Sequence, residues 1–206
     1  GDAWNWEQAM GRRRIVKCVE FGVIGVDGAG VRFDLGAILG RGQNGEVLSK
    51  PPMVEMIAED PILAHTKIIA EAWDAAGLYQ AGSFSTSRRW AEWNGKFRDD
   101  ARAFMCGKEN TIAALATRIA GSSDLVQPSS RSPCNSINFI TSHDGFTLAD
   151  LVSYEDKHNQ ENGEDNRDGS DHNISWNSGV EGDTAEPQIN WLRSRRMRSL
   201  AVILMI

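Results

Sequence analysis

Three acidic residues at the ends of short apolar runs are the part of this sequence best suited to chemistry. The runs are Val31-Arg32-Phe33-Asp34, Ile68-Ile69-Ala70-Glu71 and Ile137-Asn138-Phe139-Ile140-Thr141-Ser142-His143-Asp144. Apolar runs of this kind are typical of parallel strands covered by helices, and functional side chains in such sheets lie at the carboxyl ends of the strands. Carboxylates gathered there indicate acid/base or nucleophilic chemistry, and glycoside hydrolysis is the reaction class that most often uses such a set.

The spacing of the three acids predicts how their strands are connected. Asp34 and Glu71 are 37 residues apart, and Glu71 and Asp144 are 73 apart. One strand–helix unit of a (β/α)8 barrel takes roughly 30 residues, because about 250 residues build eight units. The first interval therefore fits one unit and the second fits two. A strand without a catalytic acid is expected between Glu71 and Asp144, and residues 90–94 are the natural candidate.

The remaining patterns predict an α/β fold with a parallel sheet. We expect helices at 5–23, 53–63, 98–106, 110–120, 147–154 and 191–206, strands at 31–34, 67–73, 90–94 and 137–144, and loops at 36–51, 74–90, 127–133 and 155–188.

Length, charge and composition argue against some classes of function. The chain has 206 residues, of which 41% are apolar and 24% charged, and its net charge is −6. This length can bury a core, and the negative charge argues against a general binder of nucleic acids or membrane surfaces. The apolar end, 200–206, is too short for the ~18–20 residues that span a bilayer, and we expect a buried helix there.

Two further sets of residues have structural interpretations. The cysteines are three, widely spaced and without a Cys-x-x-Cys pair, which favours free, buried thiols in a reducing compartment over a disulfide framework or a zinc site; they are Cys18, Cys106 and Cys134. The basic cluster near the end of the chain is expected to form the solvated face of a helix; it consists of Arg193, Arg195, Arg196 and Arg198.

Arg32 is the first side chain expected to assist a carboxylate. Residues two apart in a strand face the same side, so Arg32 would lie beside Asp34. The guanidinium would lower the pKa of the Asp34 carboxyl and keep it an anion able to attack. An ordinary buried ion pair at a strand end fits the same pattern equally well.

Glu71 and Asp144 have candidate assistants as well. The aliphatic run before Glu71 would raise the pKa of its carboxyl, as a general acid requires, and Trp73 could offer an apolar face to a sugar ring. A half-exposed glutamate fits the same pattern. His143 and Asp144 can both hydrogen-bond sugar hydroxyls, although a single His-Asp pair is weak evidence.

Together these motifs resemble the α-amylase superfamily, glycoside hydrolase family 13. Residues 31–35 resemble its nucleophile motif, 69–74 its acid/base motif and 138–145 its transition-state motif. More narrowly, further segments resemble the isoamylase-type debranching enzymes of glycogen and starch metabolism; these are 91–99, 144–154, 157–164, 168–169 and 175–177. The resemblance covers nearly the whole chain and implies a (β/α)8 TIM-barrel fold.

The resemblance also implies roles for single residues. Asp34 would be the nucleophile that forms a covalent glycosyl-enzyme, Glu71 the acid/base, and Asp144 the stabiliser of the transition state. Such enzymes retain configuration, which places the two reacting carboxyls about 5–5.5 Å apart. The substrate would be a branched α-glucan, and no metal or other cofactor is required. Substrate contacts are expected from Arg32, Trp73, His143, His158, Asn159 and Trp176.

The chain departs from the family in two respects. Residues 11–30 match it poorly, and Ala29-Gly30 are inserted where an aromatic residue and Arg should follow Val-Asp-Gly at once; an insertion of two residues preserves the alternation of a strand. We also expect residues 1–206 to form a single partial catalytic barrel, roughly strands four to seven, without the first strands, the eighth strand and the accessory β-sandwich domains. An unclosed barrel exposes strand edges, so the segment alone should be poorly stable and nearly inactive.

Several alternatives stay open. Other α-amylase-superfamily activities, α-1,4 hydrolysis or glucan transfer, share the three carboxylates. A non-catalytic glucan-binding regulatory subunit typically lacks them, whereas all three are present here, and an inactive, degraded copy is a further alternative. The family implies a cytoplasmic location, or the plastid stroma in a plant or alga, with targeting signals outside the segment. The sequence does not discriminate among glycogen, starch and limit dextrin, or among oligomeric states.

Overall fold

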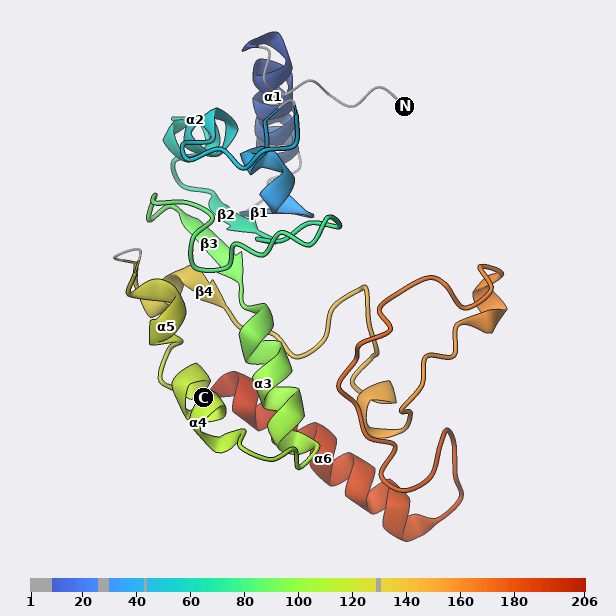
Figure 1. Ribbon diagram of the computed structural model, residues 1–206. Coiled ribbons are helices and arrows are strands. Elements are labelled where there is room, and N and C mark those ends of the chain that lie inside the picture. Colours follow the sequence, from blue (N-terminus) through green and yellow to red (C-terminus); the bar gives the residue numbers. More distant parts are fainter. Residues whose placement is uncertain (1–8, 26–29, 43, 129–130) are drawn as a thin grey trace. The chain divides into compact units, whose positions relative to one another are not determined.

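The computed structural model describes residues 9–25, 30–42, 44–128 and 131–206, which form an α/β fold with a parallel sheet (Figure 1). The sheet consists of β1 (Gly30–Phe33), β2 (Lys67–Ala70), β3 (Trp90–Trp93) and β4 (Ser136–Ile137). Its order is β1-β2-β3-β4, and every neighbouring pair is parallel. The expected strand between Glu71 and Asp144 is therefore confirmed as β3.

The chain divides into two compact units, which we describe separately. The first comprises Gly1–Trp93 and Ser123–Ile137, and the second comprises Asn94–Ser122 and Asn138–Ile206. Besides the sheet, the first unit contains α1 (Ala9–Gly25), the 3-10 helix η1 (Gly36–Gly40), α2 (Pro52–Glu59), α5 (Ser123–Val126) and η2 (Pro133–Asn135). The second contains α3 (Gly95–Met105), α4 (Ile112–Ile119), η3 (Asp150–Val152), η4 (Gln160–Asn162) and α6 (Pro187–Met205).

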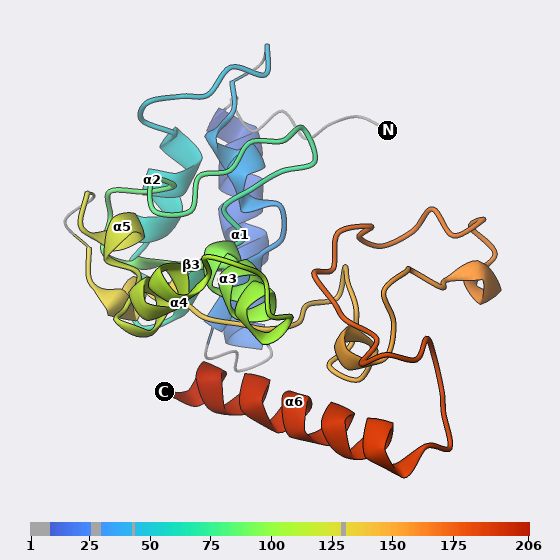
Figure 2. The ribbon, with the colours of Figure 1, turned by 60° about the horizontal axis from the view of Figure 1, so that its bottom comes forward.

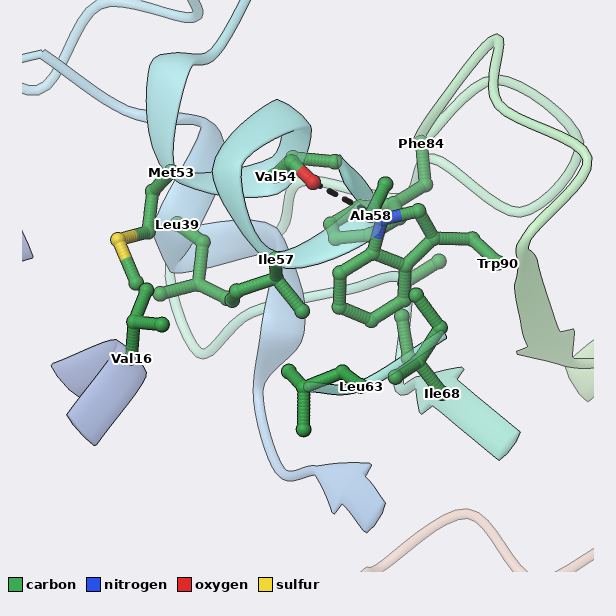
Figure 3. Packing of buried hydrophobic residues seen from close by; sticks show 12 residues of the cluster. Val16, Leu39, Met53, Val54, Ile57, Ala58, Leu63, Ile68, Phe84 and Trp90 are labelled. Atoms are coloured by element: carbon green, nitrogen blue, oxygen red, sulfur yellow. Dashed lines mark hydrogen bonds between the residues drawn. The ribbon is translucent and has the colours of Figure 1, made fainter. Parts of the chain in front are cut away.

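One face of the sheet carries the core of the first unit (Figure 3). Ile68 and Trp90 are buried on this face, against α1 and α2. The indole of Trp90 donates its Nε1–H to the carbonyl oxygen of Val54 at 3.1 Å, which satisfies its buried polar atom. Because side chains alternate along a strand, Ile69 and Ala91 point to the other face, where they are half-buried.

Local sequence explains where α2 begins and ends. Pro52 occupies its first turn, where a missing N–H costs nothing. The helix ends at Glu59, earlier than the expected 63, because Asp60 precedes Pro61 and takes an extended conformation with ψ 122°. The residue before a proline is pushed out of the helical region in this way.

The second unit has its own core. Buried apolar side chains of α3, α4, η3 and α6 pack together with Ile140 and Phe146. Asn94 caps the start of α3: its side chain accepts the N–H of Phe97 at 2.9 Å and donates to Oγ of Ser122 at 2.8 Å. Between η3 and α6 the chain is a long loop with the short turn η4, as expected for its polar composition (Figure 2).

The expected third carboxylate strand is much shorter than predicted. β4 ends at Ile137, and Asp144 lies in a turn rather than at a strand end. The carbonyl of Ile140 accepts a hydrogen bond from Nε of Arg102 at 2.8 Å, so a side chain takes the place of a neighbouring strand at this point. The helix expected at 147–154 is likewise only the 3-10 turn η3.

Expectations about the end of the chain and the thiols are partly wrong. Arg193 and Arg196 are buried, not solvated. Leu200 is buried, but the residues after it in the apolar end include exposed ones: Val202, Leu204, Met205 and Ile206. All three cysteines are free as expected, yet Cys18 and Cys134 are exposed and Cys106 is half-buried.

Residues 5–8 of the first expected helix, Ala29 of the insertion and residues 129–130 of an expected loop lie outside the described residues. Within the described part of the chain, no helix combines the length and the apolar character needed to cross a bilayer.

Candidate active site

Arg32, Asp34 and Glu71 meet at the carboxyl ends of β1 and β2. The register pairs Phe33 with Ala70, so the acid that follows each strand emerges at the same edge of the sheet. Nη2 of Arg32 forms an ion pair with Oδ1 of Asp34, and its Nη1 lies 3.7 Å from Oε2 of Glu71. One guanidinium thus contacts both carboxyls.

The guanidinium of Arg32 also packs against an aromatic side chain. It lies over the indole of Trp93, with Cζ 4.2 Å from the ring centroid. A cation over an aromatic face is attracted by the ring quadrupole. Trp93 is not among the site residues that the sequence predicts, although the strand register indicates it. Arg32 pairs with Ile69 and Ile69 with Ala91, which places Trp93 two residues further on the same face.

The two carboxyls differ in their surroundings. The side chain of Asp34 is 56% exposed, whereas that of Glu71 is 2% exposed. Oε2 of Glu71 accepts the backbone N–H of Leu35 at 2.6 Å, in addition to its proximity to Arg32. The buried carboxyl of Glu71 therefore has a hydrogen-bond donor and a cation beside it, so its polar atoms are not left without partners.

The turn after Asp34 is closely fitted to Glu71. Leu35 has φ 45°, in the left-handed region, and Gly36 follows it. A Cβ on Gly36 would lie 3.1 Å from the carbonyl oxygen of Glu71 and 3.3 Å from Cβ of Ala70. Glycine allows this close approach of the turn to β2.

Trp73 lies in the loop that follows Glu71, and its ring is paired with that of Tyr79. The two rings are nearly parallel, with an interplanar angle of 7° and centroids 5.9 Å apart. Backbone pairing between Trp73 and Tyr79 makes this loop a small hairpin. One face of the Trp73 ring is thus covered by Tyr79, which is itself 45% exposed.

The third acid and its histidine belong to the second unit. Nε2 of His143 lies 3.0 Å from Oδ1 of Asp144, and both side chains are about half exposed. The carbonyl oxygen of Asp144 accepts the N–H of Ser170 at 2.6 Å. This pairing holds the turn of Asp144 against the long polar loop of the same unit.

The other expected substrate contacts have partners within the second unit. The ring of His158 stacks on Tyr154 with centroids 3.7 Å apart. The side-chain amide of Asn159 donates to the carbonyl oxygen of Asp168 at 3.2 Å. Trp176 is 37% exposed, and the guanidinium of Arg196 lies over its ring at 4.5 Å. Each of these side chains has a structural role, and their contact with substrate stays a prediction.

Where the structure describes the chain, neither a group of metal ligands nor the pocket beside the sheet lies at the edge that carries the two acids. Among the described residues, no three His, Cys, Asp or Glu side chains are grouped so as to hold a metal ion. A pocket of about 690 Å³ opens at the amino ends of β2 and β3, the opposite end of the sheet from the two acids. Its lining contains Lys67, Arg88 and Arg89 and, among the described residues, no carboxylate.

Comparison with known proteins identifies the family. No family model matches the chain. Over its whole length, however, the chain is 45% identical to the chloroplastic isoamylase SU1 of Zea mays. It belongs to the isoamylase family. The glycogen operon protein GlgX homolog of Mycobacterium tuberculosis is 44% identical over the whole chain as well. The chain spans 28% of the length of each of these relatives.

A solved structure supports the fold of this isoamylase-family chain. A pullulanase from Anoxybacillus sp. LM18-11, crystallised with maltotriose, matches 97% of the chain with a TM-score of 0.54. The match covers 33% of the pullulanase chain at 19% sequence identity. The α/β arrangement of four parallel strands therefore corresponds to part of that larger structure.

Proposed function

We propose that the protein is a retaining glycoside hydrolase that cleaves α-1,6 branch linkages of glycogen, starch or limit dextrin. The observation that carries the proposal is the contact of one guanidinium, that of Arg32, with both Asp34 and Glu71 at a single edge of the sheet. A retaining mechanism needs two carboxyls about 5–5.5 Å apart, and a shared contact with one guanidinium supports such an approach. The linkage class is proposed from the similarity to isoamylases.

The exposures of the two carboxyls suit different roles. Asp34, exposed and paired with Arg32, attacks the anomeric carbon and forms a glycosyl ester. Glu71 donates a proton to the departing 6-hydroxyl oxygen as the glycosidic C–O bond breaks. Water then attacks the ester, Glu71 takes up the proton of that water, and the Asp34 carboxylate is released.

The buried position of Glu71 implies a movement on substrate binding. Its carboxyl is turned toward Leu35 and Arg32, and only 2% of its side chain is exposed. To reach a glycosidic oxygen, the carboxyl must exchange one of these contacts for the substrate. Catalytic hydrogen bonds commonly form their final geometry only in the substrate complex.

Asp144 and the binding residues complete the proposed machinery. Asp144 would stabilise the transition state with His143 beside it, and the exposed Tyr79 together with Trp73 would form an aromatic surface for a glucosyl ring. An aromatic ring offers a flat apolar surface against which the apolar face of a sugar ring can pack. We also propose that the sheet represents strands four to seven of a (β/α)8 barrel within one catalytic domain, in line with the partial pullulanase match.

The proposal is tested on the protein expressed from the complete gene that encodes this chain. The wild type should release linear chains from amylopectin and glycogen, seen as a stronger iodine stain and a chain-length profile of unbranched products. Glu71→Gln should lower the rate on branched glucan by about 10²–10⁴-fold, and Glu59→Gln, an exposed glutamate of α2, should leave it unchanged. Short branched products with no linear chains would instead indicate α-1,4 hydrolysis.

A trapping experiment tests the role of Asp34 directly. A fluorinated glycosyl fluoride that slows breakdown of the ester should label the wild type, and peptide mapping should locate the label on Asp34. Asp34→Asn should remain unlabelled. A label on another carboxylate, or full hydrolysis by both the Asp34→Asn and Glu71→Gln variants, would contradict the mechanism.

A further inference from the structure

The two loops that follow Asp34 and Glu71 are joined by an ion pair that the proposed mechanism does not use. Arg41 lies in the segment after β1, residues 35–42 and 44–48, which we call the loop after β1 and which includes η1. Asp74 lies in the hairpin after β2, residues 72–80. Nε of Arg41 is 2.5 Å from Oδ2 of Asp74. The side chains are 20% and 6% exposed, so water has limited access to the pair.

Each partner is also bonded to the backbone of its own loop. Nη1 of Arg41 donates to the carbonyl oxygen of Gly45 at 2.6 Å. Oδ1 of Asp74 accepts the N–H groups of Ala76 and Leu78 at 3.0 and 3.1 Å. One ion pair therefore joins the two loops, and each of its partners also holds the backbone of its own loop.

The electrostatics of the pair support a contact that stays closed. The hydrogen bond from Arg41 is the main cause that lowers the pKa of the Asp74 carboxyl, and the N–H groups of Leu78 and Ala76 act in the same direction. The same bond raises the pKa of Arg41. Both groups are thus charged at neutral pH.

The bonded loops connect directly to the two acids. The hairpin with Asp74 begins next to Glu71 and is closed by the N–H of Gln80 on the carbonyl oxygen of Ala72 at 2.6 Å. The loop with Arg41 begins at Leu35, whose N–H is donated to Glu71. A shift of either loop would therefore move the Glu71 carboxyl against its neighbours at the sheet edge.

We propose that Arg41 and Asp74 are positioning residues that fix the Glu71 carboxyl relative to Asp34 by joining the two strand-end loops. This inference rests on the proposed function, in which those two carboxyls react with one sugar. Neither Arg41 nor Asp74 needs to touch the substrate. Their effect is on the placement of the proton donor, and a misplacement on the order of 1 Å can cost about 10²-fold in rate.

The variants Asp74→Asn and Arg41→Gln remove the ion pair with little change of shape. The asparagine keeps one acceptor oxygen for the hairpin N–H groups. The matched controls are Asp165→Asn and Arg167→Gln, the same substitutions at an exposed pair whose side chains are 90% and 76% exposed and whose charged atoms lie 3.7 Å apart. Such a surface pair contributes little to stability.

Two substrates separate positioning from general damage. Hydrolysis of a branched glucan needs a proton from Glu71 on the leaving oxygen. The leaving group of α-maltosyl fluoride is the fluoride ion, which departs with almost no help from a proton donor. In the Arg41 and Asp74 variants, kcat on branched glucan should fall about 10–100-fold, with KM nearly unchanged. First-turnover fluoride release should stay within about threefold of wild type, because it tests Asp34 without the proton donor. Equal losses on both substrates, or no loss on either, would overturn the proposal.

A measurement that does not depend on catalysis tests this inference independently of the proposed function. Hydrogen–deuterium exchange of peptides covering residues 34–40 should become faster in Asp74→Asn by at least about tenfold, and not in Asp165→Asn, because the loop after β1 loses its anchor. If wild type fails to hydrolyse branched glucan while this exchange result holds, the proposed function fails and the loop anchor stands. Unchanged exchange would overturn the anchor itself.

Discussion

The backbone N–H of Leu35 donates to Oε2 of Glu71 across 2.6 Å, although the two residues are 36 positions apart in the chain. Leu35 adopts a left-handed conformation, with φ 45° and ψ 41°. For a residue with a side chain this conformation costs about 1–2 kcal/mol. The hydrogen bond to the buried Glu71 carboxyl offsets part of this cost. The turn after β1 is therefore shaped around the Glu71 carboxyl.

This relationship predicts the effect of Gly36→Ala. The new Cβ would lie 3.1 Å from the carbonyl oxygen of Glu71, so the turn or β2 must move by a few tenths of an ångström. We expect an unfolding free energy lower by about 1–3 kcal/mol and a reduced kcat on branched glucan. Chemical denaturation and initial-rate measurements check the two effects.

Gly22→Ala is the matched control for that substitution. Gly22 lies in α1, and an added Cβ there meets nothing within 4 Å. Alanine in a helix is favoured over glycine by about 1 kcal/mol, so this variant should be as stable as wild type or slightly more so. If Gly36→Ala behaves like Gly22→Ala, the close fit between the turn and Glu71 is not important for the fold or the site.

The spacing of the acids was the strongest predictor of the fold. An interval of one strand–helix unit and one of two correctly placed β3 between the strands associated with Glu71 and Asp144. The pairing of Arg32 with Asp34 also followed from alternation along a strand. These features were predictable because they depend on backbone periodicity, which the sequence carries locally.

Features that depend on side chains reaching across the chain were not predictable. The apolar run 137–144 looks like a strand, but Arg102 bonds the carbonyl of Ile140 and the ladder ends at Ile137. The sequence predicts Arg196 in solvent, yet it is buried and donates to the carbonyl oxygen of Trp176 at 2.8 Å. A long loop has many carbonyls without ladder partners, so the arginines of the neighbouring helix satisfy some of them.

The ion pair between Asp74 and Arg41 is not predictable from the sequence for a related reason. Asp74 and Gly77 together form a turn signal, and that signal predicts the hairpin but not its partner. Arg41 lies 33 positions away, in a segment expected to be a loop. Only the parallel register of β1 and β2 brings these two loops to the same edge.

The buried ion pair between Glu92 and Arg131 should be important for the stability of the first unit. Their side chains are 4% and 1% exposed, and Glu92 also accepts the N–H of Gly82 at 2.5 Å. Arg131→Met leaves an uncompensated buried carboxylate, which should lower the unfolding free energy by about 3–5 kcal/mol. Denaturant titration measures this loss.

Arg167→Met is the control, because Arg167 belongs to an exposed pair, and it should change the free energy by at most about 1 kcal/mol. The double variant Glu92→Gln/Arg131→Met should recover part of the stability, since the unpaired charge is gone. A loss below 1 kcal/mol for Arg131→Met alone would mean that water or another cation reaches Glu92.

The Arg41–Asp74 pair predicts a pH dependence. Because the hydrogen bond from Arg41 lowers the pKa of Asp74 below its ordinary value of 3.8, the folded state binds that proton less readily than the unfolded state. The stabilisation is therefore fully present above the ordinary value and is lost as the pH falls through the lowered one. Arg41, whose pKa is raised, stays charged throughout this range.

The measurement compares thermal midpoints of wild type and Asp74→Asn between pH 2 and 7. The difference should be constant above about pH 5 and shrink below the ordinary pKa of an aspartate. In an Arg41→Gln background the same comparison should depend less on pH, because the main cause of the lowered pKa is absent. A difference that grows as the pH falls would have the wrong sign for this ion pair.

The three thiols should react at different rates. Burial raises the pKa of the Cys106 thiol, although Arg196, 3.6 Å from its Sγ, acts in the opposite direction. Because the thiolate is the reactive form, iodoacetamide at pH 8 should modify the exposed Cys18 and Cys134 first and Cys106 at least about tenfold more slowly. In guanidinium the three rates should converge, since unfolding removes the burial. A Cys106 that reacts as fast as Cys134 in the folded protein would show that the α3–α6 packing around it opens readily.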